Sequence, residues 1–388
     1  MAVQAAHRSD RVIRRFRLRV KGVVQGVGFR PFAYALARQM GLSGFVLNDN
    51  QGVLIEIEGH GAEHFAAAVD AKRPPLARID SIETVEIVPT GEADFAIRDS
   101  ISGKAATRIG ADAATCDECL QELFDPQSRF FHYPFVNCTQ CGPRLTITKA
   151  LPYDRAQTSM AGFIMCDACR ADYDNPLNRR FHAEPVACPA CGPKLSHDTK
   201  VIADAVRAGK IVALKGIGGF HLVCDARSED AVAALRQRKM RDEKPFAVMV
   251  RDCSAARQFV QLSAAEAWLM ESPARPVVIA ESRGRLPENI APGLKRLGIM
   301  LAYAPVHHLL LSELEKDGET PVLVATSANP GGEPLVGRNA DAERRLVAIA
   351  DLIVTHDRDI VVRADDSVML MIDGAPAFLR RARGFVPD

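Results

Sequence analysis

The chain has 388 residues, of which 47% are hydrophobic and 25% are charged, and its formal net charge is +1. These values suit a globular protein of two or three domains, and they exclude a strong overall attraction to nucleic acid or anionic membranes. No uncharged apolar run is long enough to predict a membrane helix or a signal peptide. We therefore expect a cytoplasmic protein with no membrane or nucleic-acid partner.

The first predicted element is a half-buried strand in FRLRVKG, where Phe16, Leu18 and Val20 alternate with basic residues. The glycine-rich stretch GVVQGVGFR, residues 22–30, follows it. The spacing of apolar residues in PFAYALARQMG then predicts a helix with Pro31 in its first turn. A glycine-rich turn between a strand and a helix offers backbone N–H groups to an anion.

Two further strands, a helix over residues 60–72 and strands near 81–88 and 94–98 give the order βαββαβ of ferredoxin-like folds. The stretch VKGVVQGVGFRPFAYALARQMGLSGFVLNDNQGVLIEIEG resembles the acylphosphatase family, over about 85 residues. The resemblance implies that Arg30 holds a phosphate bidentately and that Asn48 orients the attacking water. Such a site needs no metal or general base, because phosphoryl transfer mainly requires positioning and electrostatic support. The implied phosphate-binding loop is Gln25, Gly26, Val27, Gly28 and Phe29.

A four-cysteine unit then occurs twice, as CDECLQELFDPQSRFFHYPFVNCTQCGPRL at residues 116–145 and as CDACRADYDNPLNRRFHAEPVACPACGPKL at residues 166–195. The copies share thirteen of thirty positions, and each carries two CxxC pairs separated by eighteen residues. Disulfides are rare in a reducing compartment, and four thiolates suit a tetrahedral Zn²⁺ ion. We predict a duplicated zinc ribbon with two structural zinc sites, whose ligands are Cys116, Cys119, Cys138, Cys141, Cys166, Cys169, Cys188 and Cys191.

The sequence leaves open whether each zinc takes its ligands from one copy or from both. His132 and His182 fall at equivalent places and are interpreted as framework residues, with a polar lining as the alternative. A nucleic-acid-binding zinc protein is an alternative function. It is disfavoured because residues 116–194 carry 8 Lys and Arg against 9 Asp and Glu.

Strands and helices alternate from about residue 200. The stretch KIVALKGIGGFHLVCDA predicts two strands about a glycine turn, Ser228 caps the helix that follows, and PFAVMV and PVLVATSANPGG predict further strands. The polar residues of TSAN come where a strand ends, which is where open α/β sheets bind ligands. Cys224 and Cys253 stand outside any pair and are interpreted as small buried residues.

The stretches KGIGGFHL, KMRDEKPFAVMV and TSANPGGEPL resemble the YrdC family, over about 185 residues. The resemblance implies an α/β domain with a twisted mixed sheet that binds ATP and forms a carbamoyl-type adenylate. KGIGGFHL replaces the family's more usual Pro-Thr-Glu-Thr type of sequence, which disfavours threonine as substrate. YrdC-type tRNA modification is a further alternative. The implied binding residues are Lys215, Lys239, Arg241, Lys244, Thr326, Ser327, Asn329 and Arg363, with Arg380 and Arg381 as weaker candidates.

Two carboxylates in VRADDSV, Asp365 and Asp366, could meet the Mg²⁺ that accompanies ATP, although exposed turn carboxylates are the commoner interpretation. The Mg²⁺ ligands are therefore left open.

The order of these three units, together with CTQCGPRLTI, LPYDR, RRFHAEPVACPACGP and RRARGFVP, resembles the HypF family over essentially the whole chain. The resemblance implies an α+β multidomain fold: an acylphosphatase-like domain over 1–102, a zinc-finger-like domain over 103–198 and a YrdC-like domain over 199–388. It also implies that carbamoyl phosphate is cleaved to carbamate and phosphate. Carbamate then reacts with ATP to give carbamoyl-adenylate and pyrophosphate.

In that family a further domain transfers the carbamoyl group to the terminal cysteine of the partner HypE, for the cyanide ligands of nickel-iron hydrogenase. We do not expect that domain in this chain, and so expect adenylate formation without the final transfer. A non-catalytic maturation scaffold is the alternative, disfavoured by the presence of Arg30, Asn48 and Lys239. Because carbamate decomposes quickly in water, the zinc segment is hypothesised to align the two sites around an enclosed path.

Overall fold

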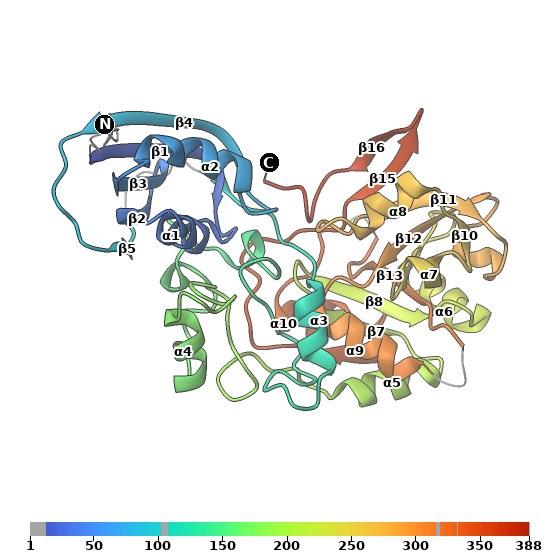
Figure 1. Cartoon of the computed structure of the whole chain (residues 1–388). Coiled ribbons are helices and arrows are strands. Elements are labelled where there is room, and N and C mark those ends of the chain that lie inside the picture. Colours follow the sequence, from blue (N-terminus) through green and yellow to red (C-terminus); the bar gives the residue numbers. More distant parts are fainter. Residues whose placement is uncertain (1–12, 102–107, 316–318, 332, 388) are drawn as a thin grey trace, which may run out of the picture.

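The computed structural model describes residues 13–101, 108–315, 319–331 and 333–387. The N-terminal unit and the C-terminal unit lie apart, and the zinc segment, teal to green in Figure 1, runs between them. The predicted boundary between residues 102 and 103 lies outside the described residues. Among the residues that are described, no helix has both the length and the apolar character needed to cross a membrane.

The N-terminal unit is a sheet in the order β4-β1-β3-β2-β5 with helices packed on it. Its elements follow the predicted βαββαβ order as far as β4, and the short strand β5 comes after them. Its strands pair antiparallel except for β2 with β5, which are parallel. The helix predicted from residue 60 is a 3-10 turn, Ala62–His64, followed by α2. The elements are β1 Arg14–Gln25, α1 Phe29–Gln39, β2 Ser43–Asp49, β3 Gly52–Gly59, α2 Phe65–Lys72, β4 Arg78–Ile87 and β5 Phe95–Ile97.

The alternation in β1 buries Leu18 and Val20 in the core of this unit, together with Ile55 and Ile57 of β3 and Phe65 of α2. Each buried side chain of this size contributes about 1.5–3 kcal/mol. A short strand, β6 Arg108–Ile109, leaves the zinc segment and pairs parallel with the end of β1. This pairing holds the zinc segment beside the glycine-rich loop.

Each copy of the zinc segment consists of turns around one short helix, α3 Asp117–Phe124 or α4 Asp167–Asp174. The first cysteine of each copy is the N-cap residue of its helix. His132 and His182 both have φ of 52°, and each packs on the preceding phenylalanine ring. Because the repeated histidines share an unusual backbone conformation, they are part of the repeated framework, as the sequence predicts.

The C-terminal unit is built on a ten-stranded mixed sheet in the order β14-β7-β8-β13-β9-β12-β11-β15-β16, with β10 paired to β11. The mixed sheet is the one predicted. Its strands are β7 Val212–Lys215, β8 Phe220–Asp225, β9 Ala247–Val250, β10 Val260–Gln261, β11 Val277–Ser282, β12 Arg296–Leu301, β13 Leu323–Ser327, β14 Leu352–Val354, β15 Val368–Ile372 and β16 Ala375–Arg380. Its helices are α5 Thr199–Arg207, α6 Glu229–Lys239, α7 Cys253–Ala256, α8 Ala264–Glu271, α9 Pro305–Leu314 and α10 Asn339–Arg345.

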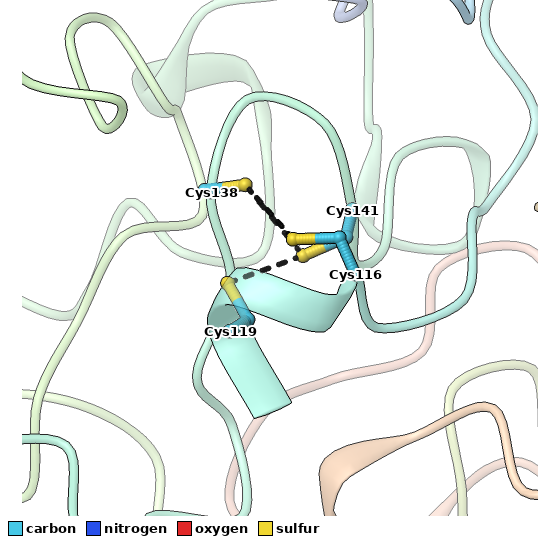
Figure 2. Close-up of side chains that lie close together, drawn as sticks. All are labelled: Cys116, Cys119, Cys138 and Cys141. Carbon is cyan, nitrogen blue, oxygen red and sulfur yellow. Dashed lines mark hydrogen bonds between the residues drawn. The ribbon is translucent and has the colours of Figure 1, made fainter. Parts of the chain in front are cut away.

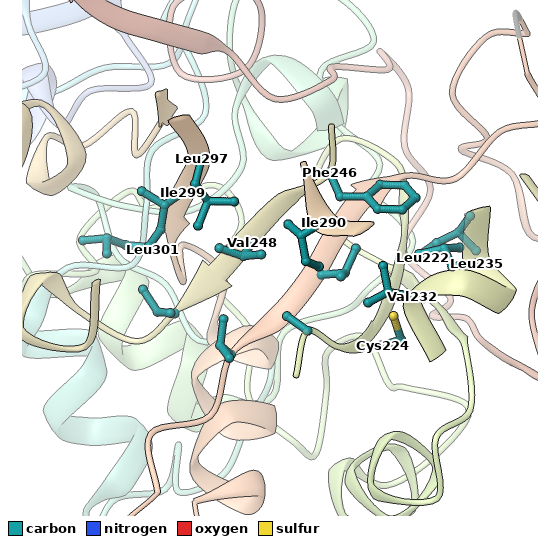
Figure 3. Packing of buried hydrophobic residues seen from close by; sticks show 14 of the residues in the cluster. Leu222, Cys224, Val232, Leu235, Phe246, Val248, Ile290, Leu297, Ile299 and Leu301 are labelled. Atoms are coloured by element: carbon teal, nitrogen blue, oxygen red, sulfur yellow. The ribbon is translucent and has the colours of Figure 1, made fainter. Parts of the chain in front are cut away.

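The main core of this unit lies between the sheet and helices such as α6, where Val232 and Leu235 pack near Leu222 of β8 (Figure 3). The predicted helix cap is present, because the hydroxyl of Ser228 accepts from the backbone N–H of Ala231. Cys224 and Cys253 are both buried in the hydrophobic core, as predicted. The largest of the three cavities described below is lined by residues of β9, β11, β12 and β13.

Candidate functional site

The eight paired cysteines form two compact groups, and each group comes from one copy of the repeat. The structure therefore groups the thiolates within each copy of the repeat and not between the copies. In the first group the Sγ–Sγ distances are 3.7 Å between Cys116 and Cys138, 3.8 Å between Cys138 and Cys141, and 3.5 Å between Cys141 and Cys119 (Figure 2). In the second group the three equivalent distances are 3.7, 3.8 and 3.6 Å.

These spacings fit zinc. Four sulfurs at Zn–S bonds of about 2.3 Å in a tetrahedron lie roughly 3.8 Å apart. The backbone N–H of Gln140 donates to Cys138 Sγ at 3.3 Å, which is the support that a thiolate ligand receives in such sites. Four sulfur ligands leave no open position, so the groups suit structural rather than catalytic zinc.

The glycine-rich loop lies between β1 and α1, where the chain turns sharply. Gly26 and Gly28 have φ of 71° and 72°, a conformation that favours glycine. A Cβ atom at Gly26 would approach the ring of Tyr153 to 3.2 Å, and one at Gly28 would approach Thr139 equally closely. The zinc segment therefore packs directly on the loop. The guanidinium of Arg144 also donates to the carbonyl of Gly26.

The loop, Arg30, Asn48 and the zinc segment enclose a small cavity, lined also by Arg144, His182 and Glu184. Arg30 is 8% exposed, and its Nη2 lies 2.9 Å from Oε1 of Glu184 and 3.2 Å from Oδ1 of Asp154. The cation that the sequence predicts to hold a phosphate thus has protein carboxylates as its partners. Both carboxylates belong to the zinc segment.

Asn48 is 2% exposed, and its Oδ1 has no hydrogen-bond partner among the described residues. A buried amide oxygen without a partner is costly, and such groups are found where a ligand or water supplies the missing donor. The side chain of Gln25 is held by the neighbouring strand and by the zinc segment. Its amide donates to the carbonyls of Asp49 and Gly52, and its Oε1 accepts from the N–H of Tyr153.

Two titratable groups on this cavity are strongly affected by their surroundings. Burial raises the pKa of Glu184 to about 7, although the charge of Arg30 acts against this shift. Burial, followed by the charge of Arg30, lowers the pKa of His182 to about 4. At neutral pH the imidazole of His182 is therefore neutral and can line a polar cavity without adding charge.

A second and much larger cavity of about 750 Å³ lies in the C-terminal unit, a size typical of small-molecule sites. Its wall contains Thr326 and Ser327 from the end of β13 and Phe246 beside β9. Five basic side chains line it, which suits a ligand with several negative charges. They are Arg241, Lys244, Lys295, Arg296 and Arg380.

Two predicted lysines do not present their charge to this cavity. Lys215 is 2% exposed, and its Nζ donates to Oδ1 of Asn339 at 2.7 Å and to the carbonyls of His356 and Arg358. An ammonium has three donors, so all are used. Lys239 Nζ likewise donates to the carbonyls of Ser327 and Asn329 and to Asn329 Oδ1.

Lys239 therefore holds the turn after β13 in place. Burial, together with the charge of Arg241, lowers its pKa to about 8. Arg241 lines the cavity and donates from Nη1 to Oγ1 of Thr326 at 3.0 Å. Asn329 accepts from Ser327 Oγ at 3.0 Å, and Arg363 is exposed outside the cavity wall.

The interpretation of Asp366 as an exposed turn carboxylate is wrong. Asp366 is 5% exposed, and its oxygens lie 2.7 Å from Nε2 of His221 and 2.8 Å from Nε of Arg383. The residue is paired because the fold brings it against His221 of β8 and against Arg383, which follows β16. Asp365 is half-buried and forms an ion pair with Arg380 at the cavity wall.

A third, small cavity lies where the zinc segment meets the C-terminal unit. Phe135, Gly142 and Pro143 of the first copy form one side, and Lys215 and His356 form the other. The loop 138–144 thus borders both this cavity and the one at Arg30.

The sequence reasoning missed Glu184 and Asp154 at the first cavity and Lys295 and Arg296 at the second. Glu184 carried only a weak signal, because it falls at one of the seventeen positions where the two copies of the repeat differ, with Pro134 as its counterpart. For Lys295 and Arg296 the sequence signal was also weak, because they are only a basic pair at the start of an apolar stretch.

Three families match successive parts of the chain. They are acylphosphatase over residues 16–97, the HypF finger over residues 115–148 and 165–197, and the Sua5/YciO/YrdC family, described as telomere recombination, over residues 204–382. An acylphosphatase of Thermotoga petrophila is 40% identical over 85 residues, which are 21% of this chain and 93% of that protein.

A protein named carbamoyltransferase HypF from Rhizobium leguminosarum bv. viciae is 68% identical over 391 residues, covering 100% of this chain and 52% of the relative. A crystal structure of full-length HypF in a phosphate- and nucleotide-bound form superposes with a TM-score of 0.93 at 43% identity, covering 97% of this chain and 51% of that one. The chain thus spans about half the length of these relatives. With the acylphosphatase, finger and YrdC-like parts all matched, the chain belongs to the HypF family.

Proposed function

We propose that this chain carries out two successive steps on one substrate. Carbamoyl phosphate is hydrolysed at Arg30, which breaks the bond between the carbamoyl group and phosphate with water as the second reactant. The carbamate formed then attacks the α-phosphorus of ATP at the larger cavity, where pyrophosphate leaves and carbamoyl-adenylate remains. Mg²⁺ accompanies ATP as the counter-ion of its phosphates.

At the first site the proposed roles follow from charge and burial. Arg30 is a buried cation beside a turn that contains two glycines with positive φ, so cation and backbone can approach the same phosphate. The buried Oδ1 of Asn48 has no partner in the part of the chain that the structure describes, and it can accept a hydrogen bond from the attacking water. The remaining loop residues, Gln25 to Phe29, supply backbone amides for the phosphate oxygens.

At the second site, five basic side chains line a cavity large enough for a nucleotide, and this single observation carries the second step. Arg241 and Lys244 are proposed to neutralise the charge that develops as pyrophosphate leaves. Thr326, Ser327 and Asn329, held by Lys239, are proposed to contact the nucleotide or the carbamoyl group. Lys215 and Arg363 are proposed only as supports of the surrounding backbone.

Carbamate is proposed to pass between the sites inside the protein, and the loop 138–144, which borders the first and the third cavity, is proposed to form the first part of that route. An enclosed route would protect carbamate from water. The adenylate is proposed as the donor for later transfer to the protein HypE.

The first step is tested by phosphate release from carbamoyl phosphate. Arg30→Ala should lower kcat/KM at least about 10²-fold, because it removes the main charge that stabilises the transition state. Arg38→Ala is the matched control, since Arg38 lies on the same helix but is exposed and pairs with Asp94. Equal rates for the wild type and Arg30→Ala would exclude the assignment.

A further inference from the structure

The second zinc-binding copy carries two polar residues beside Arg30 that the first copy lacks. Glu184 stands at the repeat position of Pro134, and Tyr173 stands at that of Leu123. Leu123 is fully buried in the first copy, so an apolar residue serves the shared framework at this place. Neither departure adds to the cysteine group of the second copy, so the contacts of the two side chains show what they do.

The contacts of Glu184 indicate its role. Its side chain is 1% exposed, and Oε1 accepts from Arg30 Nη2 at 2.9 Å. Oε2 accepts from the hydroxyl of Tyr173 and from the backbone N–H of Arg155, both at 2.9 Å. With both oxygens engaged the carboxylate has one orientation, and it holds the guanidinium of Arg30 from the side of the zinc segment.

We propose that Glu184 is a positioning residue for phosphate release: it fixes the guanidinium of Arg30 in the orientation that the substrate phosphate meets. This inference rests on the proposed function of Arg30. The second zinc-binding copy thus contributes to the acylphosphatase-like site, in addition to its structural role.

The positioning has a pH dependence. The groups that face Glu184 are Arg30 of α1, Asp154 and Arg155 of the loop after the first copy, and Tyr173 of α4. Burial raises the pKa of Glu184 to about 7, with Arg30 opposing the shift and Asp154 adding to it. Below that pH the neutral carboxyl holds Arg30 less firmly. Because kcat/KM follows the ionisation of the free protein, it should rise with pH through about 7.

The test compares phosphate release by wild type and Glu184→Gln over the pH range around 7. The variant keeps the shape of the side chain and removes its charge. We expect Glu184→Gln to lose kcat on the order of 10²-fold, and we expect its kcat/KM to show no rise with pH near 7. Asp174→Asn, an exposed carboxylate at the end of α4, is the control and should behave as wild type. Zinc content and thermal unfolding report whether each variant folds.

A second variant, Tyr173→Phe, removes only the hydroxyl donor to Glu184 and should give a smaller loss of kcat while keeping the rise with pH. If Glu184→Gln does not fold, unchanged kcat in Tyr173→Phe overturns the positioning role. A folded Glu184→Gln variant with the kcat and the pH profile of the wild type also overturns the positioning role. In that case the proposed function still stands if Arg30→Ala is inactive. A wild type that releases no phosphate overturns both.

A separate observation concerns the two cysteine groups. Each group takes its cysteines from one copy of the repeat, but an arginine of the other copy donates a hydrogen bond to it. Arg129 of the first copy donates from Nη1 to Cys169 Sγ of the second at 3.1 Å. Arg179 of the second copy donates from Nη2 to Cys119 Sγ of the first at 3.2 Å. These two arginines occupy the same repeat position, and so do the two cysteines.

The carboxylates that hold these arginines repeat the pattern. Arg129 pairs with Asp172 of α4, and Arg179 pairs with Glu122 of α3. A zinc ion with four thiolates carries two net negative charges, and a partly buried cation beside the sulfurs offsets them. In each site that cation comes from the other copy.

We infer that each zinc site is stabilised by the other copy of the repeat, so that the two sites retain metal as a reciprocal pair. Arg179→Gln should loosen the zinc of the first site, and Arg129→Gln that of the second. Loss of such a second contact commonly lowers metal affinity about 10- to 100-fold.

The test follows zinc transfer to a chromogenic chelator and the two ¹¹³Cd resonances of the cadmium-substituted chain. Each single variant should release one equivalent at least tenfold faster than wild type and shift one resonance, a different one in each variant. Arg170→Gln is the control, because Arg170 also lies on α4 but its guanidinium packs over the ring of Tyr173. Unchanged release in both variants, or the same resonance shifted by both, would overturn the inference.

Discussion

The buried carboxylate of Asp366 is held by two basic side chains. His221 and Arg383 both contact its carboxylate, and Arg383 is 1% exposed. Burial alone would raise the pKa of Asp366, but the charges of His221 and Arg383 outweigh it and lower the pKa well below the usual range. The pair lies at the edge of the larger cavity, so its loss affects both stability and the site.

We expect Asp366→Asn to destabilise the protein by about 3–5 kcal/mol, because it leaves the buried charge of Arg383 without its carboxylate partner. The pH dependence has a definite sign. The unfolded chain binds the proton more readily, so the contribution of Asp366 is present above about pH 4 and is lost as the pH falls further. Denaturant unfolding at several pH values checks this. Asp365→Asn, the half-buried neighbour, should cost no more than about 1 kcal/mol, and an equal loss in both variants would contradict the account.

The loop before α1 is the element on which the first site depends. Gly28 has a positive φ and contacts Thr139 of the zinc segment, whereas Gly41, after the other end of α1, has a φ of 67° and no neighbour within 4 Å of an added Cβ. Both positions carry the same backbone cost for alanine, roughly 1–2 kcal/mol. They differ only in what surrounds them.

Gly28→Ala should therefore reduce phosphate release more than Gly41→Ala at a similar loss of stability, because the added methyl group pushes the loop against the zinc segment. Phosphate release and thermal unfolding, measured on both variants, separate the two effects. Equal activity in the two variants would mean that the packing between loop and zinc segment does not shape the site.

The elements that the sequence predicts well are those with a local pattern. Alternation identifies β1, and the glycines and Pro31 identify the loop and the start of α1. The two CxxC pairs in each copy identify the zinc groups, because ligand spacing is itself local. Contacts between distant segments carry no such pattern. Glu184 lies 154 positions from Arg30, and no periodicity connects them.

The same limit explains the two lysines. Lys215 and Lys239 lie in stretches that resemble the YrdC family, but only the folded chain shows that backbone carbonyls use their donors. The sequence alone suggests that Asp366 is exposed, because it does not reveal that His221 and Arg383 contact this residue. Burial of charged residues is decided by tertiary pairing, which composition does not report.

In the whole molecule the zinc segment runs between the two units and contacts both of them (Figure 1). Its residues line the cavity at Arg30, whereas the larger cavity is lined by the C-terminal unit. Arg144 reaches the glycine-rich loop on one side, and Thr115 donates to the carbonyl of Tyr303 on the other. A segment fixed by two metal sites can hold these contacts at constant geometry. We expect zinc removal by a chelator to disturb both sites together rather than one of them.

The proposal that the two sites act in succession is tested most directly by pyrophosphate exchange into ATP in the presence of carbamoyl phosphate. The account predicts exchange in the wild type, none without carbamoyl phosphate, and none in Arg30→Ala until freshly dissolved ammonium carbamate is added. Exchange in Arg30→Ala at the wild-type rate with carbamoyl phosphate alone would contradict it, because the adenylate would then form without the step at Arg30.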